Sequence, residues 1–310
     1  MRIGMVGLGR MGANMTTRLV RGGHAVVAYD RDPAAVERAA AEGAEGVASL
    51  AQVVEALERP RVVWVMVPAG TPTEGTLAEL GRRLDEGDVV VDGGNSNYQD
   101  TQRRAAVLAE QRVLLVDAGT SGGVWGLAEG YSLMVGGDAE GVELIRPALE
   151  TLAPAPDRGW GHVGPSGAGH FVKMIHNGIE YGMMQAFAEG FAIMHHKTEL
   201  ELDLAQVAEI WRHGSVVRSW LLDLAARALA DDAALADIAP VVADSGEGRW
   251  TVAEAIALDV PAPVITHALI ARLRSRDAES YADRMLAALR NQFGGHAVQR
   301  DAGGAGGAAS

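Results

Sequence analysis

Short, nearly continuous apolar runs recur through the first half of the chain. They cover residues 2–6, 26–29, 61–67, 89–91, 113–116 and 132–135. Helix-like segments, among them 33–42 and 101–110, lie between these runs. Strands that alternate with helices indicate a mostly parallel, doubly wound sheet, and uninterrupted apolar strands are typical of a sheet covered on both faces.

The pattern changes after about residue 165, where strand-like runs give way to long amphipathic stretches. These stretches cover residues 167–196, 203–229, 250–258 and 262–289. We therefore expect an α/β domain at 1–164, followed by an all-α domain at 165–290 and a tail at 291–310. The tail ends in the low-complexity run DAGGAGGAAS, which we expect to be disordered.

A glycine motif joins the first predicted strand to the first predicted helix. Gly7, Gly9 and Gly12 stand in the pattern GxGxxG, in which the glycines allow a tight turn, close approach of a pyrophosphate, and packing of helix on strand. The helix N-terminus then favours an anion. In this context the motif predicts that the first domain is a Rossmann-type dinucleotide-binding domain.

Asp30 ends the second apolar run, where a carboxylate can accept both adenosine-ribose hydroxyls and repel a 2′-phosphate. It favours NAD over NADP as cofactor, although Arg31 beside it could pair with a 2′-phosphate, and Asp30 could instead be a helix cap before Pro33. The predicted cofactor-binding residues are Gly7, Leu8, Gly9, Arg10, Met11, Gly12, Asp30, Arg31, Val67, Pro68 and Asn95.

The segment 167–182 places Lys173, His176, Asn177 and Glu180 on one stripe of a helix. Relative to Lys173 the others lie at roughly −60°, +40° and −20°, and Glu180 is about 10 Å farther along the axis. The other faces of this helix are apolar, so we expect it to be largely buried and the stripe to line a cleft rather than to be a solvated helix face.

A hydride acceptor implies an alcohol to be oxidised, and Lys173 is a candidate base if burial or neighbouring cations lower its pKa. Residues 92–97 and 117–123 resemble loops at the C-terminal ends of strands, where doubly wound sheets bind ligands. His195 and His196 are interpreted as a partly exposed helix-end pair, and we expect no metal site.

Composition narrows the range of partners. The 310 residues are 48% hydrophobic and 22% charged, with a net charge of −13. An acidic protein is a poor partner for nucleic acid or an anionic membrane. The sequence contains no cysteine and neither a signal-peptide pattern nor an apolar run long enough to cross a bilayer. We expect a cytoplasmic protein.

Five segments together resemble the decarboxylating 6-phosphogluconate dehydrogenases, in that family's order from residue 1 to 296. They are DGGNSNYQDT, SGGVWGLAEG, GPSGAGHFVKMIHNGIEYG, SGEGRWT and FGGH. The run HFVKMIHNGIEYG is highly specific, whereas GLGRMG is shared by the whole β-hydroxyacid dehydrogenase superfamily. The chain is similar to the short form, in which the helical domain is not duplicated.

The resemblance implies a role for each matching position. Lys173 would be the general base and Glu180 the general acid in converting 6-phosphogluconate to ribulose 5-phosphate and CO2, a reaction of the pentose phosphate pathway. The substrate's carboxylate and hydroxyls would be held by Asn95, Ser121, Gly122, Gly123, His176 and Asn177. The phosphate end would be held by Tyr181, Arg249, Arg272, Arg290 and His296, the last two from a neighbouring subunit.

Arg249 departs from the family pattern, which often has lysine at this position. The resemblance further implies a homodimer or homotetramer that acts on a phosphorylated sugar acid. Two alternatives stay open. One is another β-hydroxyacid dehydrogenase, of the 3-hydroxyisobutyrate type, which needs neither Glu180 nor the basic tail. The other is a nicotinamide-binding regulatory protein without turnover.

Overall fold

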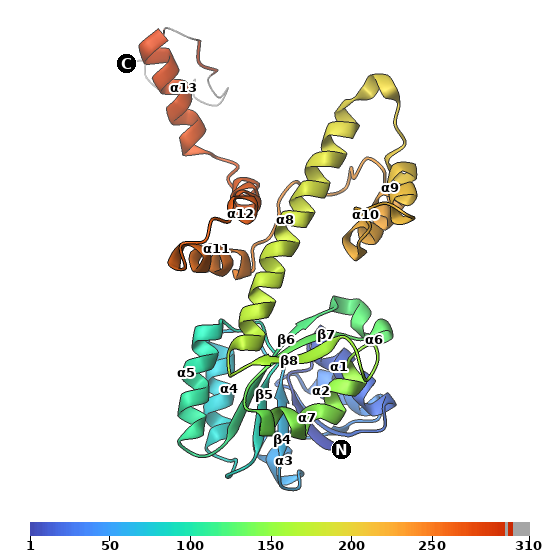
Figure 1. Cartoon of the computed structure of the whole chain (residues 1–310), viewed down its shortest axis with the longest axis vertical. Coiled ribbons are helices and arrows are strands. Elements are labelled where there is room, and N and C mark those ends of the chain that lie inside the picture. Colours follow the sequence, from blue (N-terminus) through green and yellow to red (C-terminus); the bar gives the residue numbers. More distant parts are fainter. Residues whose placement is uncertain (295–296, 300–310) are drawn as a thin grey trace, which may run out of the picture. The chain divides into compact units, whose positions relative to one another are not determined.

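The computed structural model describes residues 1–294 and 297–299, and it divides the chain into two compact units (Figure 1). The first unit comprises Met1–Glu180 with Gly246–Pro261, and the second comprises Tyr181–Ser245 with Ala262–Ser310. The boundary lies inside the long helix α8 (Ala168–His196), whose first part belongs to the sheet unit. The sequence pattern instead predicted the boundary between the α/β and all-α domains near residue 165.

The first unit is built on an eight-stranded sheet in the order β3-β2-β1-β4-β5-β6-β7-β8. Neighbouring strands are parallel except β6 and β7, which are antiparallel. This arrangement confirms the predicted doubly wound α/β sheet. The strands are β1 (Arg2–Val6), β2 (Ala25–Tyr29), β3 (Glu45–Gly46), β4 (Val62–Val65), β5 (Val89–Asp92), β6 (Leu114–Ser121), β7 (Ser132–Gly136) and β8 (Trp160–Gly164).

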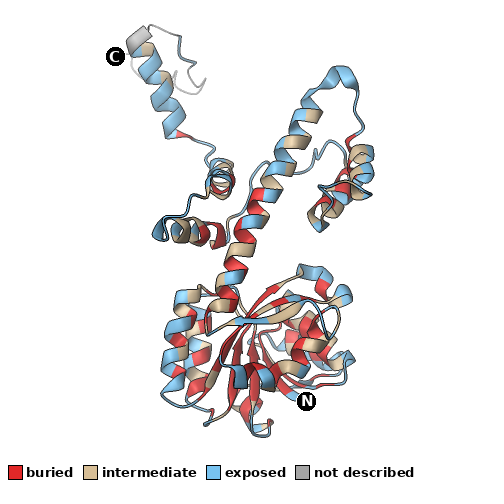
Figure 2. Cartoon of the chain, in the orientation of Figure 1, coloured by how far each residue is buried: buried red, intermediate tan, exposed pale blue. Residues whose placement is uncertain are grey.

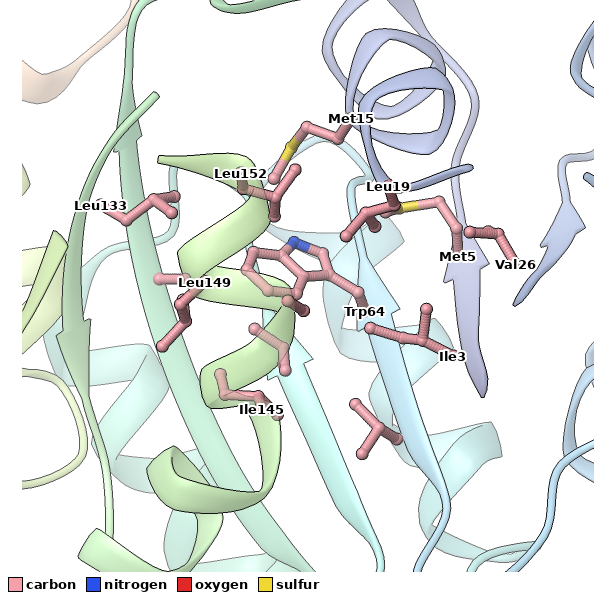
Figure 3. Packing of buried hydrophobic residues seen from close by; sticks show 14 of the residues in the cluster. Ile3, Met5, Met15, Leu19, Val26, Trp64, Leu133, Ile145, Leu149 and Leu152 are labelled. Atoms are coloured by element: carbon pink, nitrogen blue, oxygen red, sulfur yellow. The ribbon is translucent and has the colours of Figure 1, made fainter. Parts of the chain in front are cut away.

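Helices cover both faces of this sheet. Trp64 lies at the centre of one buried cluster, to which α1 (Arg10–Arg21), α2 (Pro33–Ala41) and α7 (Ala139–Leu152) contribute side chains (Figure 3). The opposite cluster receives side chains from α3 (Leu50–Glu55), α4 (Thr71–Gly81) and α5 (Tyr98–Ala109). Burial on both faces explains why the central strands are continuously apolar.

The edges of the sheet differ from the sequence expectation. The two residues of β3 are exposed, and β8 carries no apolar run, so neither strand was predicted. Residues 117–123 were interpreted as a loop, which is wrong for their first part because β6 continues to Ser121. The antiparallel strand β7 pairs with this extension, with Ser121 opposite Ser132. This pairing keeps residues 117–121 in the sheet.

The predicted all-α domain is also confirmed, since the remaining elements are helical. After α8 they are η2 (Thr198–Leu200), α9 (Leu204–Arg212), α10 (Trp220–Asp231), α11 (Glu247–Ala257), α12 (Pro263–Arg274) and α13 (Tyr281–Gly294). Two short helices of the first unit, η1 (Gly123–Trp125) and α6 (Gly126–Glu129), lie between β6 and β7. In the second unit, Phe187 and Phe191 of α8 pack against Ala208 and Leu222. Within the described ranges, no helix has the length and apolar character needed to cross a membrane.

The expectation that α8 is largely buried holds for only part of the helix. Val172, Ile179 and Met183 are 36%, 52% and 39% exposed. Figure 2 shows buried residues in the first half of α8, and only exposed and intermediate residues in its second half. The single chain therefore leaves several apolar side chains of this helix exposed.

Candidate active site

A buried carboxylate fixes the start of α8 to β6. Asp117 is fully buried, and its Oδ1 and Oδ2 atoms accept hydrogen bonds from the backbone N–H groups of Gly167 (2.7 Å) and His170 (2.8 Å). The first N–H groups of a helix have no partner within the helix, and a negative charge there also suits the helix dipole. The strand thus determines where α8 begins.

Three glycines let α8 lie directly on β6 and β7. A Cβ atom at Gly119 would lie 2.4 Å from the Cβ of Lys173, and one at Gly169 would lie 2.4 Å from the carbonyl oxygen of Met134. A Cβ at Gly136 would lie 2.7 Å from the backbone nitrogen of Gly169. No side chain fits at these distances. The closeness of this packing places Lys173 against the strand backbone.

Lys173 is buried beside an amide and an imidazole. The residue is only 8% exposed. Its Nζ donates a hydrogen bond to Asn177 Oδ1 (2.8 Å) and lies 3.4 Å from His176 Nδ1. Burial lowers the pKa of the Lys173 ammonium, while the nearby charges of Glu180 and Glu247 act in the opposite direction. Lys173 therefore loses its proton at a lower pH than a solvated lysine does, as a general base requires.

The predicted stripe is assembled, and it meets the end of β6. His176 Nε2 is 3.2 Å from Ser121 Oγ, and its Nδ1 is 3.8 Å from Glu180 Oε2. Directly after Ser121, Gly122 and Gly123 have φ angles of +133° and +52°, which side-chain-bearing residues rarely adopt. Hydroxyl, imidazole, amide and carboxylate groups thus lie around a buried amine.

Helix α11 closes the other side of this part of α8. Thr251 Oγ1 donates to the carbonyl of Met174 (2.9 Å), and a Cβ at Gly178 would lie 2.6 Å from the Thr251 methyl group. Glu247 is one turn before Thr251 and is 4% exposed, so it brings a second buried carboxylate toward Lys173. Sequence reasoning did not assign Glu247 a role.

The loop after β5 is held in place by its own polar side chains. Asp92 accepts hydrogen bonds from the backbone of Gly94 (3.1 Å) and from Ser96 Oγ (2.7 Å). Buried Arg104 lies 3.6 Å from Asp92, and Asn97 caps the N-terminus of α5. This network leaves the side chain of Asn95 exposed at the C-terminal end of β5, where a doubly wound sheet binds ligands.

The glycine turn fits a dinucleotide pyrophosphate. Gly7 has a φ angle of +94°, and a Cβ at Gly12 would lie 1.9 Å from the carbonyl oxygen of Gly7. Both glycines are therefore needed by the fold itself. A Cβ at Gly9, in contrast, would meet no atom of the described residues within 4 Å. The open backbone at Gly9, at the N-terminus of α1, leaves room for a phosphate at the positive end of the helix.

Asp30 lies beside this turn and binds backbone rather than a helix end. Its Oδ2 accepts from the N–H of Leu8 (2.6 Å), and its Oδ1 accepts from the N–H of Asp32 (2.9 Å). Asp32, not Asp30, caps α2 by accepting from Ala34 (3.0 Å). Asp30 therefore orients the glycine turn, and the capping alternative considered for it belongs to Asp32.

The other predicted cofactor residues surround the same turn. Arg10 and Met11 open α1, Arg31 follows Asp30 and is exposed, and Pro68 is exposed after β4. Val67 precedes Pro68, and a Cβ at Gly7 would lie 3.0 Å from its Cγ1 atom.

Two predicted phosphate ligands meet within the second unit. The guanidinium of Arg272 lies over the ring of Tyr181, 3.6 Å from its centroid, and its Nη1 donates to the carbonyl of Ala243 (2.8 Å). Tyr181 is buried, and its hydroxyl is 3.3 Å from Ser245 Oγ. Stacking and a backbone hydrogen bond hold this arginine in one orientation.

The remaining predicted ligands lie elsewhere. Arg249 is exposed on α11 of the first unit, and Arg290 is exposed on α13 of the second unit. His296 lies outside the described residues, as does the run at 301–310 that was predicted to be disordered. His195 and His196 are exposed near the end of α8, and the described residues contain no group of three or more His, Asp or Glu side chains arranged to hold a metal ion.

Comparison with known proteins gives matches over both units. A family profile described as the NAD binding domain of 6-phosphogluconate dehydrogenase matches residues 2–163. A second profile, described as the 6-phosphogluconate dehydrogenase C-terminal domain, matches residues 169–302. A relative from Haloferax volcanii, named NAD(+)-dependent, decarboxylating 6-phosphogluconate dehydrogenase, is 43% identical over 301 residues, which are 97% of this chain and 99% of that protein.

Two solved structures are also similar. Plasmodium falciparum 6-phosphogluconate dehydrogenase superposes with a TM-score of 0.81 at 29% identity, over 98% of this chain and 67% of that one. Mycobacterium tuberculosis 3-hydroxyisobutyrate dehydrogenase superposes with a TM-score of 0.71 at 27% identity, over 91% and 95% of the two chains. This chain thus has the length of the Haloferax relative and lacks a third of the Plasmodium chain, as predicted for the short form.

Proposed function

The chain belongs to the 6-phosphogluconate dehydrogenase family, and from this premise we propose that it converts 6-phosphogluconate, with reduction of NAD or NADP, to ribulose 5-phosphate and CO2. One observation carries the proposal: buried Lys173 and half-exposed Glu180 lie on one face of α8, with His176 and Ser121 beside them. An acid and a base so placed suit a substrate that must lose one proton and gain another.

Each step follows from the position of a side chain. Lys173 takes the proton of the C3 hydroxyl, and the bound nicotinamide supplies the acceptor for the C3 hydride. The resulting 3-keto acid loses its carboxyl group as CO2 because the ketone accepts the electron pair, and protonated Lys173 donates to that oxygen. Glu180 then protonates the carbon that becomes C1 of ribulose 5-phosphate. Asn95, Ser121, His176 and Asn177 hold the hydroxyls and carboxylate.

Product analysis tests this proposal. Purified protein incubated with 6-phosphogluconate and NAD or NADP should yield reduced cofactor, ribulose 5-phosphate and CO2 in equal amounts. A protein that turned over 3-hydroxyisobutyrate but not 6-phosphogluconate with either cofactor would instead be a β-hydroxyacid dehydrogenase of the other type. Binding of NAD without turnover of either acid would support a regulatory protein.

We further propose that NAD is the preferred cofactor. Asp30 supports this, because it follows β2 beside the glycine turn, which is where the ribose-binding carboxylate of a Rossmann domain stands. A 2′-phosphate about 4 Å from this carboxylate would be repelled by roughly 4 kcal/mol at an effective dielectric of 20, before relaxation and screening. Arg31 is exposed and offsets part of this repulsion, whereas Asp30 is fixed in place by two backbone hydrogen bonds.

Asp30→Asn should therefore reduce the ratio of kcat/KM for NAD to that for NADP by about 10-fold or more. Steady-state kinetics with both cofactors measures this ratio. Asp32→Asn is a matched control, since it removes a carboxylate two residues away and leaves a side chain that also caps helices well. A wild-type preference for NADP that Asp30→Asn left unchanged would mean that Arg31 determines the choice.

We also propose that the active molecule is at least a dimer. Apolar side chains that are largely exposed in the single chain support it, among them Ile193 on α8 (71% exposed), Val264 on α12 (68%) and Leu286 on α13 (60%).

A chain ending at Leu289 lacks Arg290 and His296. We expect its KM for 6-phosphogluconate to rise about 10–100-fold, because one or two charged hydrogen bonds to the phosphate are lost. A chain ending at Arg300 is the control. Full activity of the shorter chain as a monomer, measured with light scattering, would contradict a shared site.

A further inference from the structure

A buried histidine of α8, His170, forms a hydrogen bond with helix α5 beside the candidate active site. His170 lies on α8 one turn before Lys173 and is 2% exposed. Its Nδ1 is 2.7 Å from Oγ1 of Thr101, a residue of α5 that is itself fully buried. Its Nε2 has no hydrogen-bond partner among the described residues. Buried polar atoms are nearly always paired, so an unpaired nitrogen at this position calls for an explanation.

For a neutral ring, the hydrogen bonds of Thr101 leave two arrangements, and the Asp117 carboxylate lies 3.9 Å from Nδ1 in both. The Thr101 hydroxyl can also donate to the carbonyl of Asn97 (3.2 Å). If it does, Nδ1 of His170 carries the proton and donates to Thr101, and Nε2 is an unpaired acceptor. If Thr101 donates to Nδ1 instead, Nε2 is an unpaired donor. In both cases folding leaves one ring nitrogen unsatisfied, which an apolar side chain of similar size would avoid.

The hydrogen bond between His170 and Thr101 connects α8, which carries Lys173, to α5, which follows the loop that carries Asn95. Asn97 caps α5 and follows the loop that carries Asn95, while His170 precedes Lys173 by one turn of α8. The same contact region contains Tyr98 and Phe171, whose ring centroids are 5.2 Å apart. The Asp117 bonds fix the start of α8 to β6, but the packing of Tyr98 on Phe171 is by itself non-directional and does not fix α8 against α5. A buried hydrogen bond fixes their register.

We propose that His170 is a positioning residue for hydride transfer. Through Thr101 it fixes the register of α8 against the β5–α5 loop, and so the position of Lys173 relative to the substrate held at Asn95. The inference rests on the proposed function and deepens it. A displacement of about 1 Å at a reacting centre can lower a rate by about 100-fold, so a residue with no contact to the substrate can have a large effect.

The expected signature is a stable but slow enzyme. His170→Leu removes the unpaired nitrogen and leaves the Thr101 hydroxyl its bond to Asn97, so the melting temperature should stay the same or rise. In contrast, kcat should fall about 10–100-fold, while KM for 6-phosphogluconate and for the cofactor changes less than about 3-fold. His170→Asn retains a donor near the Nδ1 position and should recover most of kcat. His195→Leu, an exposed histidine of the same helix, is the matched control.

The kinetic isotope effect separates positioning from a structural role. With 6-phosphogluconate deuterated at C3, misplacement of Lys173 slows hydride transfer, so the isotope effect on kcat should increase in His170→Leu and return toward the wild-type value in His170→Asn. Thr101→Val breaks the same bond from the other side and should give the same increase. It decides the question if His170→Leu fails to fold.

Two results would overturn the inference. One is an unchanged isotope effect in both His170→Leu and Thr101→Val. The other is a loss of kcat that is fully accounted for by the loss of folded protein, measured by stoichiometric binding of reduced cofactor. Failure of the proposed function looks different, because the wild-type protein itself would then release no CO2 from 6-phosphogluconate. The same variants would in that case be measured on the acid that the wild type does oxidise.

Discussion

Replacement of Lys173 by methionine is expected to lower kcat for oxidation of 6-phosphogluconate by about 10²–10⁴-fold, the usual contribution of a positioned base. Methionine keeps the length and apolar stem of lysine and fits against Gly119, so the protein should fold. Lys173→Arg is the complementary variant, since arginine keeps the charge but does not lose a proton near neutral pH. Both variants should be equally slow, as measured by the rate of cofactor reduction.

A control is available because Lys173 and Lys197 are the two lysines of the sequence. Lys197 is exposed and pairs with Glu199 just after α8. Lys197→Met should therefore keep wild-type activity. Activity of Lys173→Arg near that of the wild type would show that charge, not proton transfer, is what this position supplies.

The same scarcity of lysine allows a direct titration. Protein labelled with ¹³C at lysine Cε should give two signals, and Lys197→Met assigns them. The Lys173 signal should titrate below the usual lysine value of about 10.4, because burial disfavours the charged form. The base must be neutral to act, so kcat/KM should rise with pH through this pKa and level off above it. A Lys173 midpoint at or above 10.4 would contradict a base activated by burial.

Glu180→Gln is expected to slow protonation of the enediol by about 10²-fold while leaving oxidation less affected. Glutamine keeps the size of the side chain but cannot donate a proton to carbon. Exchange of tritium at C1 of ribulose 5-phosphate isolates this half-reaction, because it needs no redox step. The exchange rate per active site is the measurement.

Glu189→Gln is the control for this variant, since Glu189 is an exposed carboxylate of the same helix that pairs with Gln185. It should exchange tritium at the wild-type rate. Wild-type exchange by Glu180→Gln would assign the proton donor elsewhere, and buried Glu247 would be the next carboxylate to replace.

The sequence predicted those parts of the fold that leave a local signal. Central strands such as β4 and β5 are buried on both faces and therefore read as apolar runs, and the stripe on α8 follows from helical periodicity alone. The edge strand β8 half-faces solvent and has no such run. The direction of β7 is likewise invisible in its composition, so the extension of β6 to Ser121 was taken for a loop.

The site was predictable where its residues share one helix, and not where it depends on contacts between distant segments. Lys173, His176 and Glu180 follow from their spacing, but the bonds from Asp117 to the start of α8 join residues about 50 positions apart. No local pattern indicates such a pair. Residues that only support the site, such as His170 and Thr101, are apparent only once the two helices are seen together.

The close packing at Gly119, Gly136 and Gly169 has a consequence for mutational tolerance. Lys173 can lie against the strand only because these three positions have no side chain. Any other residue would add a Cβ atom for which there is no space. Laboratory evolution toward other sugar acids should find almost no acceptable exchange there, whereas the exposed position Asn95 can accept other side chains. Under the proposed function, substrate range can therefore change at exposed positions such as Asn95, while the three glycines beside Lys173 stay invariant.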